Sequence, residues 1–275
     1  MKTTLVSIPT DTIPLDGAWY EPDGGTVRGA VLLFHGNTMN FYMGAPRFLP
    51  PVLAQLGYAC LAFNRRGHDI LGIRNSRSAE GAAFQTHSEA IRDNETAAKW
   101  VAERGFSKPI VIGHSNGGML AVRHVAEHPE TPALVLLSAH CGGKNILPLS
   151  SKAGLLAQDR LEEITEKARS LVKAGRGREL MLLPGWWHVI TAESFLDLSN
   201  CPDILELAPR IACQTLYLRG DKELRDLYPA EEFARRAKGA CEVQIVPDCD
   251  HFYVGREEEI ARRVSRWLGH VLKPA

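Results

Sequence analysis

Apolar and polar positions along the chain predict strands and helices that follow one another in turn. Runs such as 29–34, 58–63 and 133–137 are apolar without interruption, which is typical of strands buried on both faces of a sheet. Residues 88–104 are rich in Ala, Glu, Arg and Lys and predict a long helix. The predicted strands are 3–8, 12–20, 29–34, 58–63, 109–113, 133–138, 214–218 and 241–246, and the predicted helices are 46–56, 88–104, 117–127, 157–174, 229–238 and 256–271. This alternation predicts an α/β fold with a mostly parallel central sheet and helices on both faces.

The alternation stops between residues 141 and 209, where the pattern contains a helix at 157–174 but no convincing strand. Long departures of this kind inside compact domains are usually functional or disordered. We therefore expect a body formed by 1–140 and 210–275, with 141–209 inserted as a helical lid. The insertion contains an aromatic and apolar group that predicts an apolar substrate pocket, although the two tryptophans could instead pack the lid onto the body. This group is Trp186, Trp187, Phe195 and Leu196.

The charge balance of the chain bears on which molecules it binds. Thirty-two basic residues balance 32 acidic ones, so no overall field attracts nucleic acid or an anionic membrane, and a small molecule is the expected partner. The pattern contains no secretory signal and no apolar stretch near the roughly 20 residues that span a bilayer. The six cysteines lack C-x-x-C spacing, which predicts free thiols in a reducing compartment. We expect a cytoplasmic protein, whose oligomeric state the sequence leaves open.

The segment Gly113-His114-Ser115-Asn116-Gly117 carries the strongest chemical signal. It joins a predicted strand to a predicted helix, and glycines two positions either side of a serine permit a turn sharp enough to hold that serine on a strained backbone. The positive end of the following helix would lie behind the serine oxygen. The sequence therefore predicts a nucleophile elbow with Ser115 as the nucleophile.

A serine hydroxyl needs a base to remove its proton and an acid to orient that base. His251 lies in the loop after the last predicted strand, at the sheet edge where open parallel sheets place their ligand crevice, and is the predicted base. The acid is expected in the loop after strand 214–218, which offers both Asp221 and Glu223.

In the order serine, acid, histidine, the chain resembles the α/β-hydrolase superfamily. The resemblance covers 27–140 and 210–271 and implies that Glu223, three residues after a glycine, is the acid, with Asp221 as the alternative. It also implies that the backbone N–H groups of Asn37 and Asn116 form the oxyanion hole. A serine at the elbow separates the chain from branches that use aspartate there and from dienelactone hydrolases, which use cysteine.

A second motif from the superfamily resembles its Asp-x-Arg-Gly-x-Gly turn. Here it reads Asn64-Arg65-Arg66-Gly67-His68-Asp69, and the resemblance implies that Arg66 and Gly67 are scaffold residues. We give His68 no catalytic role.

These motifs together predict a serine hydrolase that cleaves a carboxylic ester or lactone of a small, largely apolar substrate through an acyl-enzyme, without a cofactor. The same triad could instead serve an acyltransferase or a carbon–carbon bond hydrolase. A third alternative is a ligand-binding module on the same fold with an unused triad.

One motif points elsewhere. His124-Val125-Ala126-Glu127-His128 fits the H-x-x-E-H pattern, whose two histidines share one helix face and could bind zinc. A catalytic zinc site needs three protein ligands, and the sequence shows no obvious third ligand, so we predict no metal. A histidine near the end of a helix also interacts favourably with the helix dipole.

Overall fold

A computed structural model describes residues 1–24, 26–73, 79–185 and 189–272. Its centre is an eight-stranded sheet with the order β1-β2-β4-β3-β7-β8-β11-β12. β1 and β2 pair antiparallel, β2 also pairs antiparallel with β4, and every other pairing in this sheet is parallel. The strands are β1 (Lys2–Ile8), β2 (Leu15–Glu21), β3 (Gly29–Phe34), β4 (Tyr58–Phe63), β7 (Ile110–His114), β8 (Ala133–Leu137), β11 (Gln214–Gly220) and β12 (Cys241–Val246).

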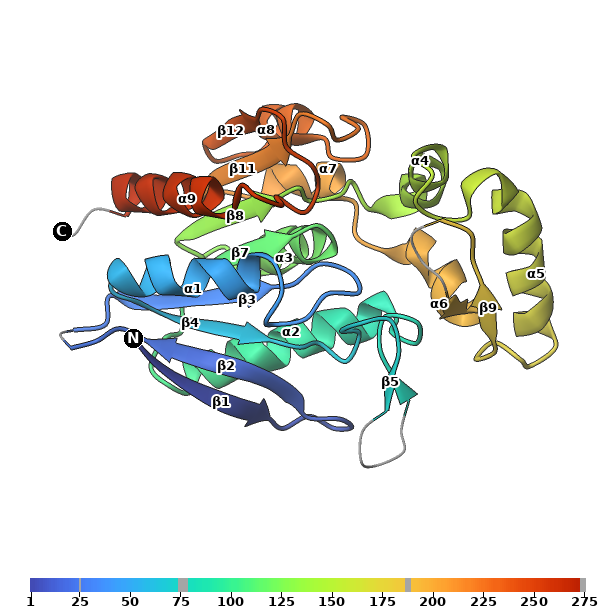
Figure 1. Cartoon of the computed structure of the whole chain (residues 1–275), viewed down its shortest axis with the longest axis horizontal. Coiled ribbons are helices and arrows are strands. Elements are labelled where there is room, and N and C mark those ends of the chain that lie inside the picture. Colours follow the sequence, from blue (N-terminus) through green and yellow to red (C-terminus); the bar gives the residue numbers. More distant parts are fainter. Residues whose placement is uncertain (25, 74–78, 186–188, 273–275) are drawn as a thin grey trace.

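Helices cover the two faces of this sheet (Figure 1). They are α1 (Ala45–Gln55), α2 (His87–Ala102), α3 (Asn116–Glu127), α8 (Ala230–Arg236) and α9 (Glu257–Val271). Buried residues of α1 and α9 form one apolar cluster with the sheet, and buried residues of α2, α3 and α8 form a second cluster. The predicted α/β fold, with helices on both faces, is therefore confirmed.

Local sequence explains where α2 begins. Thr86 accepts a hydrogen bond from the backbone N–H of Glu89, and the Glu89 carboxylate accepts one from the backbone N–H of Thr86. This capping box satisfies two N–H groups that a helix start leaves without partners. It fixes the beginning of α2 beside the pocket described below.

The segment between β8 and β11 contains further helices and a small hairpin. The helices are α4 (Ile146–Lys152), α5 (Leu161–Lys173), α6 (Ala192–Asp197) and α7 (Ile204–Leu207), and the hairpin pairs β9 (Leu180–Leu182) with β10 (Val189–Thr191) antiparallel. The absence of strands predicted for 141–209 was wrong, because three-residue strands are too short to show a period of two. A second short hairpin, β5 (Gly72–Ile73) with β6 (Ala79–Glu80), was also missed.

Residues 141–209 are hereafter called the insertion. Its elements α4, α5, α6 and β9 lie beyond the carboxyl ends of the parallel strands (Figure 1), whereas α7 contacts α3 and α8 of the body. The insertion's buried residues Ile164, Ile190 and Phe195 belong to the same apolar cluster as α2 and α3. Trp186 and Trp187 lie outside the described residues. The insertion is therefore joined to the body by a continuous hydrophobic core.

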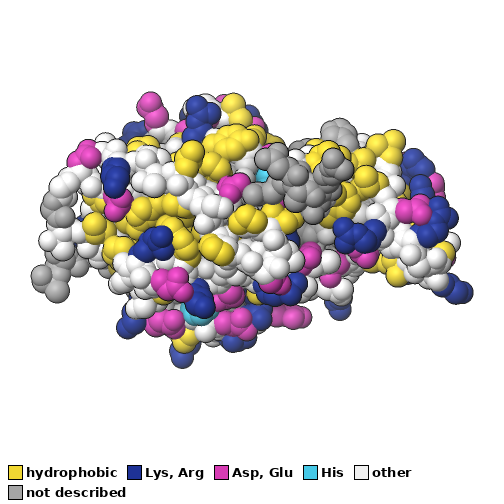
Figure 2. Space-filling model, turned by 90° about the horizontal axis from the view of Figure 1, so that it is seen from below, with side chains coloured by type: hydrophobic (Ala, Val, Ile, Leu, Met, Phe, Trp, Pro, Cys, Tyr) yellow, Lys and Arg dark blue, Asp and Glu magenta, His cyan; other side chains and the backbone are white. Residues whose placement is uncertain are grey.

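The surface shows no separation of charge on the face seen in Figure 2, where Lys and Arg side chains lie among Asp and Glu. All six cysteines are free. Across the described ranges, none of the helices has the length and apolar character needed to cross a bilayer. The interspersed charges fit the balance of 32 basic and 32 acidic residues.

Candidate active site

Ser115 occupies the sharp turn between β7 and α3. Its backbone angles, φ 56° and ψ −118°, lie in a region that residues with a side chain rarely adopt. A Cβ on Gly113 would lie 2.2 Å from the carbonyl oxygen of Gly117, and one on Gly117 would lie 2.2 Å from that of Phe34. Only glycine fits either position, so the turn has the form of a nucleophile elbow.

The structure brings Ser115, His251 and Glu223 into one hydrogen-bonded line, although they are far apart in sequence. Nε2 of His251 lies 2.9 Å from Oγ of Ser115, and Nδ1 of His251 lies 2.7 Å from Oε1 of Glu223. The ionised carboxylate can only accept, so Nδ1 carries a proton and Nε2 is free to accept the serine proton. The Glu223 side chain is 3% exposed, which keeps this contact out of water.

Asp221, the other acid that the sequence offers, lies apart from this line. It is exposed, and its Oδ1 accepts a hydrogen bond from the backbone N–H of Cys249 at 3.1 Å. Hydrogen bonds from the backbone of residues 248 and 249 lower the pKa of Asp221. The structure therefore places Glu223, and not Asp221, against His251.

Two donors hold the far oxygen of Glu223. Oε2 accepts the backbone N–H of Gly220 at 2.7 Å and the hydroxyl of Ser138 at 2.6 Å. Oγ of Ser138 also lies 2.6 Å from the hydroxyl of Tyr253, which donates toward the carbonyl oxygen of Leu218 at 3.2 Å. Burial raises the pKa of Tyr253 well above its ordinary value, so the phenol stays a donor. These contacts to Oε2 fix the orientation of the carboxylate, so that Oε1 faces His251.

His114, the residue between Gly113 and Ser115, supports the loop that carries His251. Burial lowers the pKa of His114 to about 3, so its ring is neutral. Its Nε2–H donates to the backbone carbonyl of His251 at 2.9 Å, and the two rings lie 5.0 Å apart between centroids. The elbow therefore positions both the serine and the loop of its partner histidine.

Asn37 and Asn116 both lie beside Ser115, where the sequence places the oxyanion hole. Within the described part of the chain, neither backbone N–H donates to another group, so both remain available to a ligand. The loop that carries Asn37 is held by His35, whose Nε2 accepts the backbone N–H of Arg65 at 3.1 Å. Nη2 of Arg65 also donates to the His35 carbonyl at 2.6 Å.

His140 contacts the side chain of Asn116 from the other side. Nδ1 of His140 accepts the backbone N–H of Gly142 at 3.1 Å, and its Nε2 lies 3.3 Å from Oδ1 of Asn116. Burial, together with the nearby His87 and His251, lowers the pKa of His140 to about 3. The ring is therefore neutral, and its Nε2–H donates to Asn116.

A cavity of about 80 Å³ opens from Ser115 between the body and the insertion. Nδ2 of Asn37, which lines this cavity, is buried and lacks a hydrogen-bond partner among the described residues. Phe195 is fully buried in the core, and neither Phe195 nor Leu196 is among the described lining residues. The larger aliphatic lining residues are Ile146, Leu155, Leu156, Ile190, Leu198 and Leu227, and the polar ones include Gln85, Thr86, His87, His140, Ser150 and Ser194.

The turn after β4 joins the sheet to α2. Arg66 donates from Nε and Nη2 to Asp93 of α2 at 2.9 and 2.7 Å. A Cβ on Gly67 would lie 1.9 Å from Oε1 of Gln85, so the turn passes too close for a side chain. His68 contacts Asp69 and does not approach the triad. The contacts of Arg66 and Gly67 are those of scaffold residues.

Four polar residues at the site were not found from the sequence: His114, Ser138, His140 and Tyr253. His114 lies inside the elbow and Tyr253 two residues after His251, so proximity to the motifs was a usable signal for both. Ser138 and His140 follow β8, and the only signal there was their place at the carboxyl end of a central strand.

The sequence model of the alpha/beta hydrolase family matches residues 31–263. The chain belongs to the α/β hydrolase family. The match includes the elbow, the acid loop and His251, together with the whole insertion between them.

Solved structures of other α/β hydrolases share the fold of this chain. Est1E from Butyrivibrio proteoclasticus with bound ferulic acid has a TM-score of 0.74 at 17% identity, covering 98% of this chain and 100% of that one. A thermostable carboxyl esterase from Bacillus coagulans has a TM-score of 0.72 at 15% identity, covering 98% and 99%. Dienelactone hydrolase from Anabaena variabilis has a TM-score of 0.61 at 19% identity, covering 98% and 97%. At such identities the likeness concerns the fold alone.

Proposed function

We propose that this α/β hydrolase cleaves carboxylic esters or lactones of small, largely apolar substrates. The observation that carries the proposal is the contact of His251 with Ser115 at 2.9 Å on one side and with Glu223 at 2.7 Å on the other. These distances lie within the reach needed for nucleophile, base and orienting acid. The esterases and hydrolases among the similar structures support the same reaction class.

In the proposed mechanism, Ser115 attacks the carbonyl carbon of the bound ester while Nε2 of His251 takes the hydroxyl proton. Negative charge that develops on the carbonyl oxygen is stabilised by the backbone N–H groups of Asn37 and Asn116 and by the N-terminal end of α3. His251 then gives its proton to the departing alcohol oxygen, leaving an acyl group on Ser115. Water, deprotonated by His251, cleaves that acyl-enzyme and restores the serine. Glu223 stays ionised throughout and stabilises the imidazolium.

The pocket supports a short acyl group. Its volume of about 80 Å³ is small, and its aliphatic side chains come mostly from the insertion. We therefore propose that the insertion acts as a lid that sets acyl length, and that short acyl chains are cleaved faster than long ones. The six free cysteines support a reducing, cytoplasmic location for the reaction.

The test combines covalent labelling with a substrate series. A fluorophosphonate should label the parent chain on Ser115, and Ser115→Ala should abolish both the labelling and the hydrolysis of p-nitrophenyl esters. Ser150→Ala, which alters another serine of the same pocket, is the matched control and should still be labelled on Ser115. Labelling of Ser115→Ala at the parent rate, or cleavage of esters by that folded variant at the parent rate, would refute the assignment. Added alcohol acceptors report whether acyl transfer competes with hydrolysis.

A further inference from the structure

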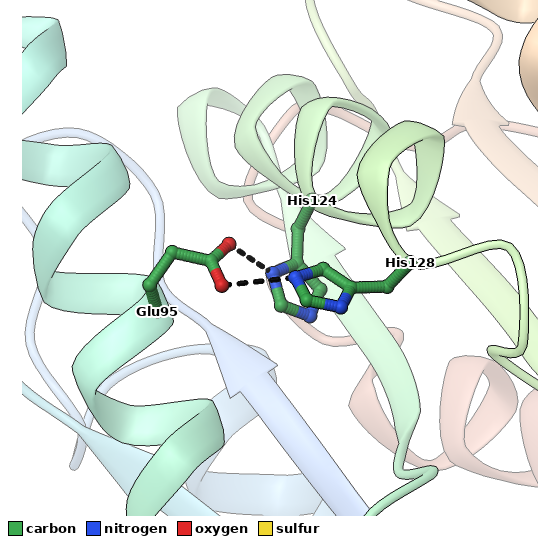
Figure 3. A group of neighbouring side chains, drawn as sticks. All are labelled: Glu95, His124 and His128. Atoms are coloured by element: carbon green, nitrogen blue, oxygen red, sulfur yellow. Dashed lines mark hydrogen bonds and ion pairs between the residues drawn. The ribbon is translucent and has the colours of Figure 1, made fainter.

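A second group of histidine and carboxylate side chains lies away from the triad, near the carboxyl end of α3. His124 and His128 project from one face of this region toward Glu95 of α2, as Figure 3 shows. Nδ1 of His124 lies 2.7 Å from Oε1 of Glu95, and Nε2 of His128 lies 2.9 Å from Oε2. The two rings stack with centroids 4.2 Å apart. One carboxylate therefore contacts both imidazoles.

This grouping supplies the third ligand that the H-x-x-E-H pattern lacked. Glu95 comes from a different helix, 29 residues before His124, so sequence spacing did not reveal it. Glu127, the glutamate within the pattern, instead forms an ion pair with Arg123 on its own helix. The site therefore differs from the zinc-protease arrangement that the pattern describes, in which that glutamate acts as the base.

The donor set fits a borderline transition metal. Two imidazole nitrogens and a carboxylate oxygen are ligands that zinc prefers, with bonds of about 2.0–2.2 Å. The three ligand atoms lie within 4.8 Å of one another. Ligand atoms around a tetrahedral zinc ion are about 3.3 Å apart, so small side-chain rotations would close the group around an ion. Magnesium and calcium, which prefer oxygen ligands, fit poorly.

A carboxylate on the far side of His128 gives a separate argument for a cation. Oε1 of Glu130 lies 3.4 Å from Nδ1 of His128, while Oε2 of Glu95 faces its Nε2. A neutral ring has one N–H and can donate to only one of the two carboxylates. A metal ion on Nε2 would leave the ring N–H free to face Glu130. With a metal there, Nδ1–H donates to Glu130, the arrangement in which carboxylates orient metal-bound histidines.

Burial and charge also suit such a site. The His124 side chain is 4% exposed, whereas Glu95 and His128 are 36% and 35% exposed, so the ligands are anchored on one side and open to solvent on the other. Glu95 supplies the negative charge of the group, beside the two imidazoles.

We propose that Glu95, His124 and His128 form a three-residue binding site for Zn²⁺, with a fourth position open to water. The ion would join α2 to the end of α3 and stabilise the fold. His124 follows Ser115 by nine residues, about 13 Å along the helix at 1.5 Å per residue, so the site is separate from the nucleophile. Both ligating nitrogens must be unprotonated, so Zn²⁺ binding weakens in acid.

Calorimetric titration of the EDTA-treated full chain with ZnCl₂ tests the proposal without any ester substrate. We expect one Zn²⁺ per chain and a Tm rise of about 5 °C when free Zn²⁺ exceeds its Kd a hundredfold. Glu95→Gln and His128→Ala should each weaken binding at least about a hundredfold, since loss of an outer partner alone costs 10–100-fold. The control His270→Ala, which removes an exposed histidine of α9, should bind like the parent.

Co²⁺ substitution excludes binding by thiols. Cobalt held by two imidazoles and a carboxylate gives visible d–d bands without the near-ultraviolet charge-transfer band of a Co–thiolate bond. The proposal is overturned if Co²⁺ binding produces that thiolate band, if Glu95→Gln retains the parent affinity for Zn²⁺, or if the parent chain binds no Zn²⁺. In that last case the three side chains form a hydrogen-bonded cluster without an ion.

Discussion

Replacing Glu223 with glutamine tests the triad most sharply, because the structure fixes how the new amide must lie. The position of Oε2 faces two donors, the backbone N–H of Gly220 and the hydroxyl of Ser138, at 2.7 and 2.6 Å. The amide oxygen therefore takes that position, and the amide NH₂ faces Nδ1 of His251. Nδ1 must then accept a hydrogen bond, which moves the ring proton to Nε2. A histidine in that tautomer cannot take the proton of Ser115.

The expected fall in kcat of Glu223→Gln follows from the free-energy cost of the opposite amide orientation. If the amide NH₂ instead faced Gly220 and Ser138, buried hydrogen-bond donors would face one another without acceptors. This orientation costs about 3 kcal/mol of free energy. Fewer than about 1% of molecules then hold the productive tautomer, so kcat should fall at least ~10²-fold, approaching the ~10⁴-fold loss found when a triad acid becomes an amide. KM should change little, because Glu223 is absent from the described lining of the pocket.

The assay is steady-state hydrolysis of p-nitrophenyl butyrate, with circular dichroism and urea unfolding to establish that the variant is folded. Asp221→Asn is the matched control, since an asparagine oxygen can still accept the N–H of Cys249, and it should stay near the parent rate. The reasoning is refuted if folded Glu223→Gln keeps its rate within about tenfold, or if Asp221→Asn loses as much as Glu223→Gln.

Three further substitutions test the support around the triad. Tyr253→Phe removes the hydroxyl bonded to Ser138, so urea unfolding should show a loss of about 1 kcal/mol and kcat should fall less than about tenfold. Gly117→Ala should prevent folding, as judged by circular dichroism and thermal melting, because its Cβ would lie 2.2 Å from a backbone oxygen. Burial lowers the pKa of His114 to about 3, so unfolding between about pH 3 and 6.5 takes up a proton there and stability falls as pH falls. The slope of the free energy of unfolding against pH should therefore be smaller in His114→Phe by about 1.4 kcal/mol per pH unit. Urea unfolding at several pH values measures this slope.

Each of these predictions has a clear contrary result. An unchanged free energy of unfolding in Tyr253→Phe would mean that the hydrogen bonds of this hydroxyl in the folded protein are no more favourable than its hydrogen bonds to water in the unfolded chain. A folded Gly117→Ala with the parent Tm would remove the steric account of the elbow. A slope that does not differ between His114→Phe and the parent would show that His114 takes up no proton on unfolding.

Sequence predicted the body of the fold well because its strands are long, apolar and separated by amphipathic helices. The predicted strand 58–63 and helix 117–127 match β4 and α3 to within one residue. The short strands β9 and β10 were missed because three residues carry too little periodicity. Ser115 and His251 were placed from motif and loop position, since both follow strands whose carboxyl ends share one sheet edge.

The rest of the site depends on contacts between distant segments, which local pattern does not encode. Ser138 and Glu223 are 85 residues apart, and Glu95 and His128 are 33 apart. In the loop 219–224 only the resemblance to the superfamily, through the spacing from Gly220, favoured Glu223 over Asp221. Their difference appears only when the loop after β12 brings His251 beside one of them.

The shared hydrophobic core of insertion and body limits how this protein can change during evolution or engineering. Phe195, Ile190 and Ile164 pack in one cluster with residues of α2 and α3, and each such side chain contributes about 1.5–3 kcal/mol by its burial. Excising the insertion would uncover that cluster and favour aggregation. Heat should accordingly melt both parts in a single cooperative transition. New selectivity would have to arise by point substitutions on the cavity wall, because a wholesale exchange of the insertion would break the core beneath it.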